Sequence, residues 1–83
     1  LHPGFRTVVI GAGGGIGAAV AARLAGDPRC GVLHCVSRSG DAGPTSAIRH
    51  AADLTDAASM AAAAAAIGAD GPIDLIFIAS GLL

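Results

Sequence analysis

The residues most suited to chemistry form a run of glycines near the start of the chain, Gly11-Ala12-Gly13-Gly14-Gly15-Ile16-Gly17. Glycine adopts positive φ angles without strain and lets a ligand approach the backbone closely. If a helix begins within this run, its first N–H groups have no partners inside the helix and favour an anion such as pyrophosphate. The run therefore predicts a phosphate-binding turn. The alternative is a turn that serves chain geometry alone.

The spacing of the glycines separates several kinds of phosphate-binding loop. A P-loop requires Gly-x-x-x-x-Gly-Lys-Ser/Thr, and the chain has no lysine, which excludes nucleotide hydrolysis of that kind. The common dinucleotide-binding pattern Gly-x-Gly-x-x-Gly, started at Gly11, needs a third glycine where Ile16 stands. Started at Gly13, it reads Gly-x-Gly-x-x-Ala with Ala18 and begins two residues later. The glycines are therefore expected to follow a pattern whose spacing differs from both of these.

Few other side chains suggest chemistry. The two cysteines, Cys30 and Cys35, fit neither a disulfide framework nor a metal or redox pair, so we expect reduced, buried thiols in a cytoplasmic protein. The three histidines, His2, His34 and His50, have no metal-ligand spacing relative to each other or to the cysteines. His34 lies in an apolar run and is expected to be a hydrogen-bonded core residue.

Short apolar runs and helical patterns alternate around the glycines. Continuous apolar runs predict buried strands over residues 6–10, 32–36, 48–52 and 74–78. Apolar residues at helical spacing predict a helix over residues 15–25 that ends at Gly26. A second helix is expected from a cap at Thr55, through an alanine-rich stretch, to Ile67. Residues 41–46 are expected to form a loop.

The order β-α-β-β-α-β predicts an α/β fold whose strands pair in parallel through right-handed crossovers. It corresponds to the first half of a Rossmann-type doubly wound parallel sheet. We expect residues 1–83 to be the N-terminal part of a single dinucleotide-binding domain in a longer chain, because strand 74–78 would otherwise form an apolar edge. Asp70 and Asp74, beside the turn before that strand, are expected to stay solvated.

Composition excludes other functions. The net charge is −1 and 13% of residues are charged, which offers no basic surface to nucleic acid. The longest charge-free run, residues 7–22, is too short and glycine-rich for a membrane span of about 20 apolar residues. The chain also contains no tyrosine and no lysine. Any mechanism that needs either side chain must therefore obtain it from outside these residues.

The glycine turn resembles that of the short-chain dehydrogenase/reductase family, whose motif is Thr-Gly-x-x-x-Gly-Ile-Gly. Four positions match the motif: Gly11, Gly15, Ile16 and Gly17. Ile10 stands in place of the threonine. The run also satisfies Gly-x-x-Gly-x-x-Gly through Gly14, as in the extended branch of the family, although the Gly-Ile-Gly tripeptide favours the standard branch. The resemblance extends over nearly all 83 residues but only the first part of a usual family member.

This resemblance implies hydride transfer between a nicotinamide cofactor and a small carbonyl or alcohol substrate, in a homodimer or homotetramer without nucleic-acid or membrane partners. Family members use a Ser, a Tyr and a Lys that all follow the fourth strand. Because the chain lacks tyrosine and lysine, we expect none of residues 1–83 to be catalytic.

The end of the second predicted strand discriminates between cofactors. NAD-binding folds place an Asp or Glu about 20 residues after the glycines, where it accepts a hydrogen bond from the ribose 2′-hydroxyl. Ser37, Arg38 and Ser39 stand there instead. A carboxylate would repel a 2′-phosphate, whereas a guanidinium can bind it. NADP is therefore preferred over NAD, unless Arg38 is merely solvated. NADP users of the family often carry a second basic residue in the glycine turn, which is absent here.

Two further segments match the family. Asp53-Leu54 resembles the Asp-Val/Leu pair that contacts the adenine, although Asp53 could alternatively cap the turn ahead of Thr55. Ala79-Ser80-Gly81 lies where the family has Asn-Asn-Ala-Gly, with Ala79 in place of the second asparagine. The resemblance implies that these small residues leave room for the ribose and nicotinamide of the cofactor.

The sequence thus predicts an NADP-preferring oxidoreductase of the short-chain type, with this segment supplying the cofactor-binding half. A non-catalytic NAD(P)-binding module is the first alternative, and a Tyr-x-x-x-Lys beyond Leu83 would argue against it. An S-adenosylmethionine-dependent methyltransferase is the second, because Gly11, Gly13 and Gly15 also give Gly-x-Gly-x-Gly. That class needs an acidic residue at the end of the second strand, where Ser37-Arg38 stands.

Overall fold

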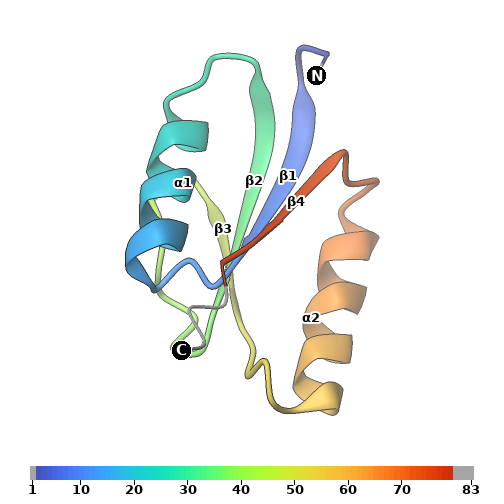
Figure 1. The fold of residues 1–83 in the computed structure, drawn as a ribbon. Helices are drawn as coiled ribbons and strands as arrows, with labels where there is room; N and C mark the ends of the chain where they lie inside the picture. Colours follow the sequence, from blue (N-terminus) through green and yellow to red (C-terminus); the bar gives the residue numbers. More distant parts are fainter. Residues whose placement is uncertain (1, 80–83) are drawn as a thin grey trace.

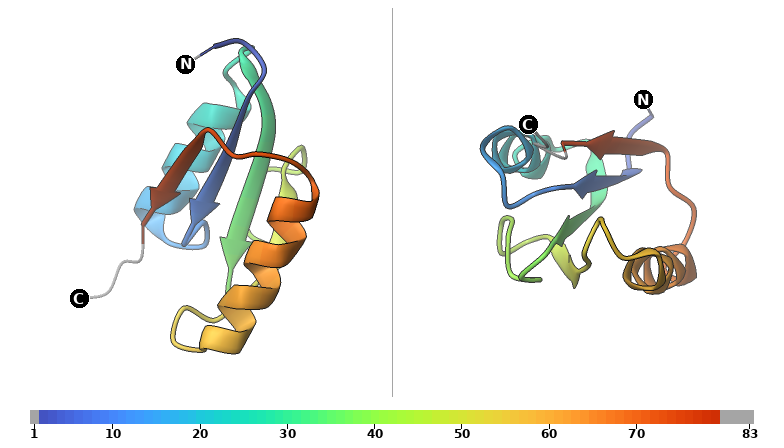
Figure 2. Two further views of the ribbon diagram at one scale, coloured as in Figure 1. Left: turned by 90° about the vertical axis from the view of Figure 1, so that its right-hand side faces the viewer. Right: turned by 60° about the horizontal axis from the view of Figure 1, so that its bottom comes forward.

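The computed structural model describes residues 2–79, whose strands and helices follow one another in the order β-α-β-β-α-β (Figure 1). The elements are β1 (Phe5–Ile10), α1 (Gly15–Ala25), β2 (Cys30–Ser37), β3 (Ile48–Ala51), α2 (Ala57–Ala69) and β4 (Leu75–Ile78). All strand pairs are parallel and the sheet order is β3-β2-β1-β4. Figure 2 shows α1 and α2 on opposite faces of the sheet. The predicted α/β fold with a parallel sheet is confirmed, and its arrangement is consistent with part of a Rossmann-type fold.

Both faces of the central strands are covered. Alternate residues of a strand point to opposite faces, so Val9 packs toward α1 and Val8 toward α2. The α1 side buries Val9, Ala12, Ala21, Leu33 and Cys35. The α2 side buries Val8, Val36, Ala52, Ala63 and Ile67. Burial on both faces explains why β1 and β2 are continuous apolar runs. Within residues 2–79, no helix is long and apolar enough to cross a membrane.

The element bounds agree closely with the sequence-based predictions. Helix α1 has the predicted bounds, and β3 and β4 each lack one predicted terminal residue. Strand β2 is longer than predicted because Cys30 pairs with Phe5 at one end and Ser37 pairs with Ala51 at the other. Cys35 is buried as expected, whereas Cys30 is only partly buried.

The start of α2 corrects a prediction. Asp56, not Thr55, is the N-cap: its carboxylate accepts from the backbone N–H of Ala58 at 3.0 Å and of Ser59 at 3.4 Å. Thr55 instead donates its N–H and hydroxyl to Asp53. The helix also continues past the predicted end at Ile67, through Ala69.

Replacing Asp56 with Ala is expected to lower the free energy of unfolding by about 1 kcal/mol, because two N–H groups of α2 lose their acceptor. Urea unfolding followed by circular dichroism measures the change. Asp56→Asn is the matched control, since asparagine caps a helix nearly as well. Equal losses in both variants would argue against the capping role.

Asp70 and Asp74, beside the turn before β4, are exposed to solvent as predicted, and both also have partners within the protein. The Asp70 carboxylate lies 2.6 Å from the Arg6 guanidinium and 3.1 Å from the His34 ring. The Asp74 carboxylate accepts from the backbone N–H of Arg6 at 2.9 Å, which is the main cause of its lowered pKa. Together these bonds attach the α2–β4 connection to β1.

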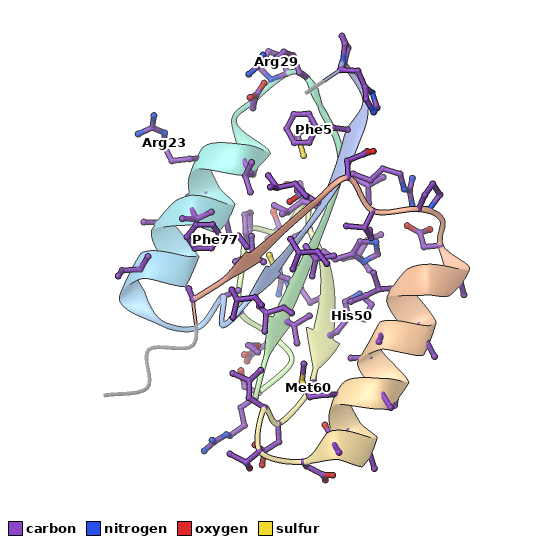
Figure 3. The ribbon with its side chains drawn as sticks, turned by 45° about the vertical axis from the view of Figure 1, so that its right-hand side comes forward. Phe5, Arg23, Arg29, His50, Met60 and Phe77 are labelled. Atoms are coloured by element: carbon purple, nitrogen blue, oxygen red, sulfur yellow. The ribbon has the colours of Figure 1, made fainter. Side chains whose placement is uncertain are left out.

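Strand β4 lies at one edge of the sheet of described residues, as expected. Ile76 and Ile78 pair with Val8 and Ile10 of β1 and are 58% and 65% exposed. Phe77 points the other way and packs on the α1 side of the sheet. Figure 3 shows Phe77 close to α1. The α2 face of β4 is therefore an exposed apolar surface.

Candidate functional site

A cleft of about 220 Å³ opens at the edge of the sheet where the parallel strands end. From β1 the chain passes to β2 and β3 on one side, whereas β4 lies on the other side of β1. Ligands of open α/β sheets bind at such a reversal of strand order, outside the carboxyl ends of the strands. The residues that line the cleft are Ile10, Gly11, Gly13, Gly14, Val36, Ser37, Arg38, Ala52, Leu54 and Ala79.

The turn between β1 and α1 forms the floor of this cleft. Gly11 has a φ of 90°, a conformation that favours glycine. The N–H groups of Gly11 and Ala12 both donate to the Val36 carbonyl, at 2.9 and 3.1 Å. The N–H of Gly14 then donates to the Gly11 carbonyl at 3.1 Å. These bonds hold the turn against the end of β2 and fix where α1 begins.

Gly17 has a packing role. A Cβ atom at this position would lie 2.1 Å from the Gly11 carbonyl oxygen and 2.8 Å from the Gly11 carbonyl carbon. The first turn of α1 therefore passes directly against the backbone of the glycine turn. Neither Gly17 nor its neighbours Gly15 and Ile16 line the cleft, and Ile16 is 72% exposed. The lining does not test contacts made through the backbone N–H groups at the start of α1, so the ligand contacts of these three residues stay predictions.

The start of α1 has free hydrogen-bond donors. Gly14 is the N-cap and supplies no side-chain hydrogen bond, and the first turn contains no acidic residue. The start of α2, by contrast, is capped by the Asp56 carboxylate. Unpaired N–H groups and the helix dipole together favour an anion at the start of a helix. Because Gly14 lines the cleft, these donors lie beside it.

The end of β2 contributes a cation to the rim of the cleft. Ser37 is buried, and its hydroxyl accepts from the N–H of Gly40 at 3.1 Å, which shapes the following loop. The Arg38 side chain is 81% exposed, and its guanidinium lies 3.9 Å from the Asp53 carboxylate. Ser39 bonds to Asp41 and does not line the cleft. Ser37 and Arg38 are therefore the residues that this segment brings to the site.

The segment after β3 forms the opposite rim. The Asp53 carboxylate accepts from the Thr55 hydroxyl at 2.7 Å and from the Thr55 N–H at 2.9 Å. These two bonds, with a smaller effect of the Arg38 charge, lower the pKa of Asp53 and keep it ionised. Asp53 thus closes the turn ahead of Thr55, although only Leu54 lines the cleft. Leu54 is 40% exposed and provides an apolar surface.

The cleft also contains residues that the sequence analysis assigned only to strands. Ile10, Val36 and Ala52 lie at or just beyond the carboxyl ends of β1, β2 and β3. Their position at the carboxyl ends of parallel strands is the sequence signal that could have identified them as residues of the cleft. Ala79 follows β4, lines the cleft as predicted, and donates its N–H to the Ile10 carbonyl at 2.8 Å. Ser80 and Gly81 lie outside the described residues.

Comparisons of the chain with protein-family models, with curated proteins and with solved structures found no match. The cleft itself combines three features: the uncapped start of α1, the Arg38 guanidinium and the apolar surface of Leu54. This combination suits a ligand that places one anionic group at the start of α1, a second anionic group near Arg38 and a flat apolar group against Leu54.

Proposed function

We propose that the cleft binds NADP and that this chain supplies the cofactor-binding part of an oxidoreductase of the short-chain dehydrogenase/reductase type. The observation that carries the proposal is the uncapped start of α1 beside a cleft at the reversal of strand order. A dinucleotide has a central pyrophosphate and two flat ring systems, so one ligand can satisfy the donors of α1 and the apolar surfaces on either side of them.

Each part of the proposed ligand has residues that suit it. The unpaired first N–H groups of α1 would bind the pyrophosphate, and Gly11, Gly13 and Gly14 in the preceding turn would leave room for its close approach. Leu54 would contact the adenine. Ala79, beyond β4, would lie toward the nicotinamide half. When bound, the nicotinamide would exchange a hydride with a carbonyl or alcohol substrate, and the residues described here would bind and orient it.

Arg38 supports NADP over NAD. It lines the cleft at the end of β2, and its exposed side chain is free to turn from Asp53 toward a ligand. A guanidinium binds a phosphate through charge-assisted, bidentate hydrogen bonds. Ser37, at the adjacent position, carries no negative charge that would repel a 2′-phosphate.

Calorimetric titration of the protein with NADPH, NADH and S-adenosylmethionine tests this proposal. We expect NADPH to bind at least about tenfold more tightly than NADH, a difference of about 1.4 kcal/mol. S-adenosylmethionine should not displace NADPH. Equal affinities for NADPH and NADH would contradict the preference for NADP. Displacement by S-adenosylmethionine, or no binding of either dinucleotide, would contradict the proposed function.

Replacing Arg38 with Ala is expected to weaken NADPH binding by about 10- to 100-fold, because a charge-assisted contact is worth about 1.5–3 kcal/mol. NADH binding should change little, since NADH has no 2′-phosphate. The matched control is Arg23→Ala, which removes the same charge from α1 at a position that does not line the cleft (Figure 3). Equal losses for NADPH and NADH in Arg38→Ala would contradict this role.

A further inference from the structure

A chain of polar side chains lies on the α2 side of the sheet, away from the cleft. Nδ1 of His34 on β2 lies 2.8 Å from Nε2 of His50 on β3, and the two rings are 5.0 Å apart. Nε2 of His34 lies 3.1 Å from the Asp70 carboxylate, which also pairs with Arg6. The His34 side chain is 1% exposed, as expected of a core histidine. Figure 3 shows His50 on the side of the sheet that faces α2.

This arrangement constrains where protons can lie. An ionised Asp70 requires His34 to donate its Nε2–H, so Nδ1 of His34 must accept from Nε2–H of His50. Two neutral rings satisfy both bonds. If one proton is added to the pair of rings, both hydrogen bonds can remain, because the negative charge of Asp70 balances the added positive charge. A second proton would place N–H donors on both sides of the 2.8 Å contact and two positive rings side by side.

The charged groups around the pair cannot balance a second proton. Asp70, at the end of α2, already shares its charge with the Arg6 guanidinium, and Arg6 comes from β1. On β3, Arg49 is the neighbour of His50 and points to the opposite face, where it bonds to the Asp41 carbonyl. Burial and the adjacent His34 lower the pKa of His50 below its ordinary value of 6.5.

The histidine pair joins β3 to β2, and β3 is otherwise only weakly attached to the sheet. Strand β3 has four residues, three of them exposed, and it pairs only with β2 in the sheet of described residues. The Ala52 N–H extends this pairing by donating to the Ser37 carbonyl at 2.9 Å. Ala52 and Leu54, at the end of β3, line the cleft. Detachment of β3 would therefore remove one rim of the cleft.

We propose that the His34–His50 pair is a pH-sensitive lock that holds β3 against β2 near neutral pH and releases it when a second proton enters the pair. Because the closed form binds fewer protons than the open form, closure is strongest above about pH 6.5 and weakens as the pH falls below that value. For each proton bound only by the open form, the opening constant rises by up to about tenfold per pH unit.

Hydrogen exchange of the Ala52 amide, measured by NMR from about pH 7.5 to about pH 5 and corrected for intrinsic rates, tests this lock. We expect the opening constant to rise toward acid in the unmodified protein. His50→Gln should abolish the rise, because glutamine keeps an N–H donor for His34 but does not titrate. The exposed His2 provides the matched control: His2→Gln should retain the rise. The Gly11 amide, bonded to Val36, reports whether opening is local.

A flat profile in the unmodified protein, or the same rise in His50→Gln, would overturn the lock. If His50→Gln does not fold, nitrogen-15 spectra of the rings in the unmodified protein decide the question. We expect the two rings of the pair to titrate in two separate steps, the second of them at a pH well below that at which His2 titrates. Two independent steps near the pH at which His2 titrates would overturn the proposal. The experiment uses no dinucleotide, so its outcome does not depend on whether NADP binds.

Discussion

Replacing Gly14 with Asp is expected to leave the protein folded and to weaken NADPH binding about a hundredfold, or about 2.7 kcal/mol. Gly14 has φ −84° and ψ 166°, a conformation open to any residue, and a Cβ there would lie 3.6 Å from its nearest neighbour, the Gly11 carbonyl oxygen. Asp is a preferred N-cap, so stability should change by only a few tenths of a kcal/mol. Its carboxylate would occupy the donors of α1 and repel a pyrophosphate.

The matched control for this variant is Gly14→Asn, which has nearly the same size and also caps helices but carries no charge. It should lose less affinity than Gly14→Asp in calorimetric titrations, while thermal unfolding shows both variants to be folded. If folded Gly14→Asp bound NADPH as tightly as the unmodified protein, the glycine turn would serve chain geometry alone.

Replacing Gly17 with Ala is expected to destabilise the fold by about 3 kcal/mol or more, because the new Cβ would lie 2.1 Å from the Gly11 carbonyl oxygen. The neighbour is backbone held by hydrogen bonds to Val36, so the turn must move. The better helix propensity of alanine offsets only about 1 kcal/mol. Because small domains have limited stability, much of the variant should be unfolded at room temperature.

Gly15→Ala and Gly68→Ala are the matched controls for this prediction. Both glycines lie in helices, and a Cβ at either position would meet no atom within 4 Å. Each substitution should therefore raise the free energy of unfolding, by up to about 1 kcal/mol. Urea unfolding monitored by circular dichroism compares the three variants. A Gly17→Ala variant as stable as Gly15→Ala would show that the contact between α1 and the turn is not restrictive.

The sequence predicted the elements well where a single strong pattern was present. Continuous apolar runs identified β1 and β2 because both are buried on two faces. The start of α2 was missed because Thr55 and Asp56 are adjacent and both residue types cap helices. Their roles are decided by Asp53, which engages Thr55 and leaves Asp56 to the helix.

The candidate site was predicted in part, for a physical reason. Parallel strands end at the same edge of a sheet, so residues after β1, β2, β3 and β4 meet without further information. The packing role of Gly17 depends on how closely α1 passes Gly11, which glycine spacing alone does not reveal. The bonds that Asp70 makes to Arg6 and His34 join residues far apart in sequence, so no local pattern could predict them.

Titration of the nitrogen-15-labelled protein with NADP, followed by NMR, tests the dinucleotide site most directly. We expect saturable shifts of the amides of Gly11, Gly13 and Gly14 in the turn that leads into α1, together with those of Arg38 and Leu54 at the two rims. The amides of Ile67 and Ile73, near the apolar surface beside α2, should change little. Shifts confined to that surface, or none at millimolar NADP, would contradict the assignment of this cleft to a dinucleotide.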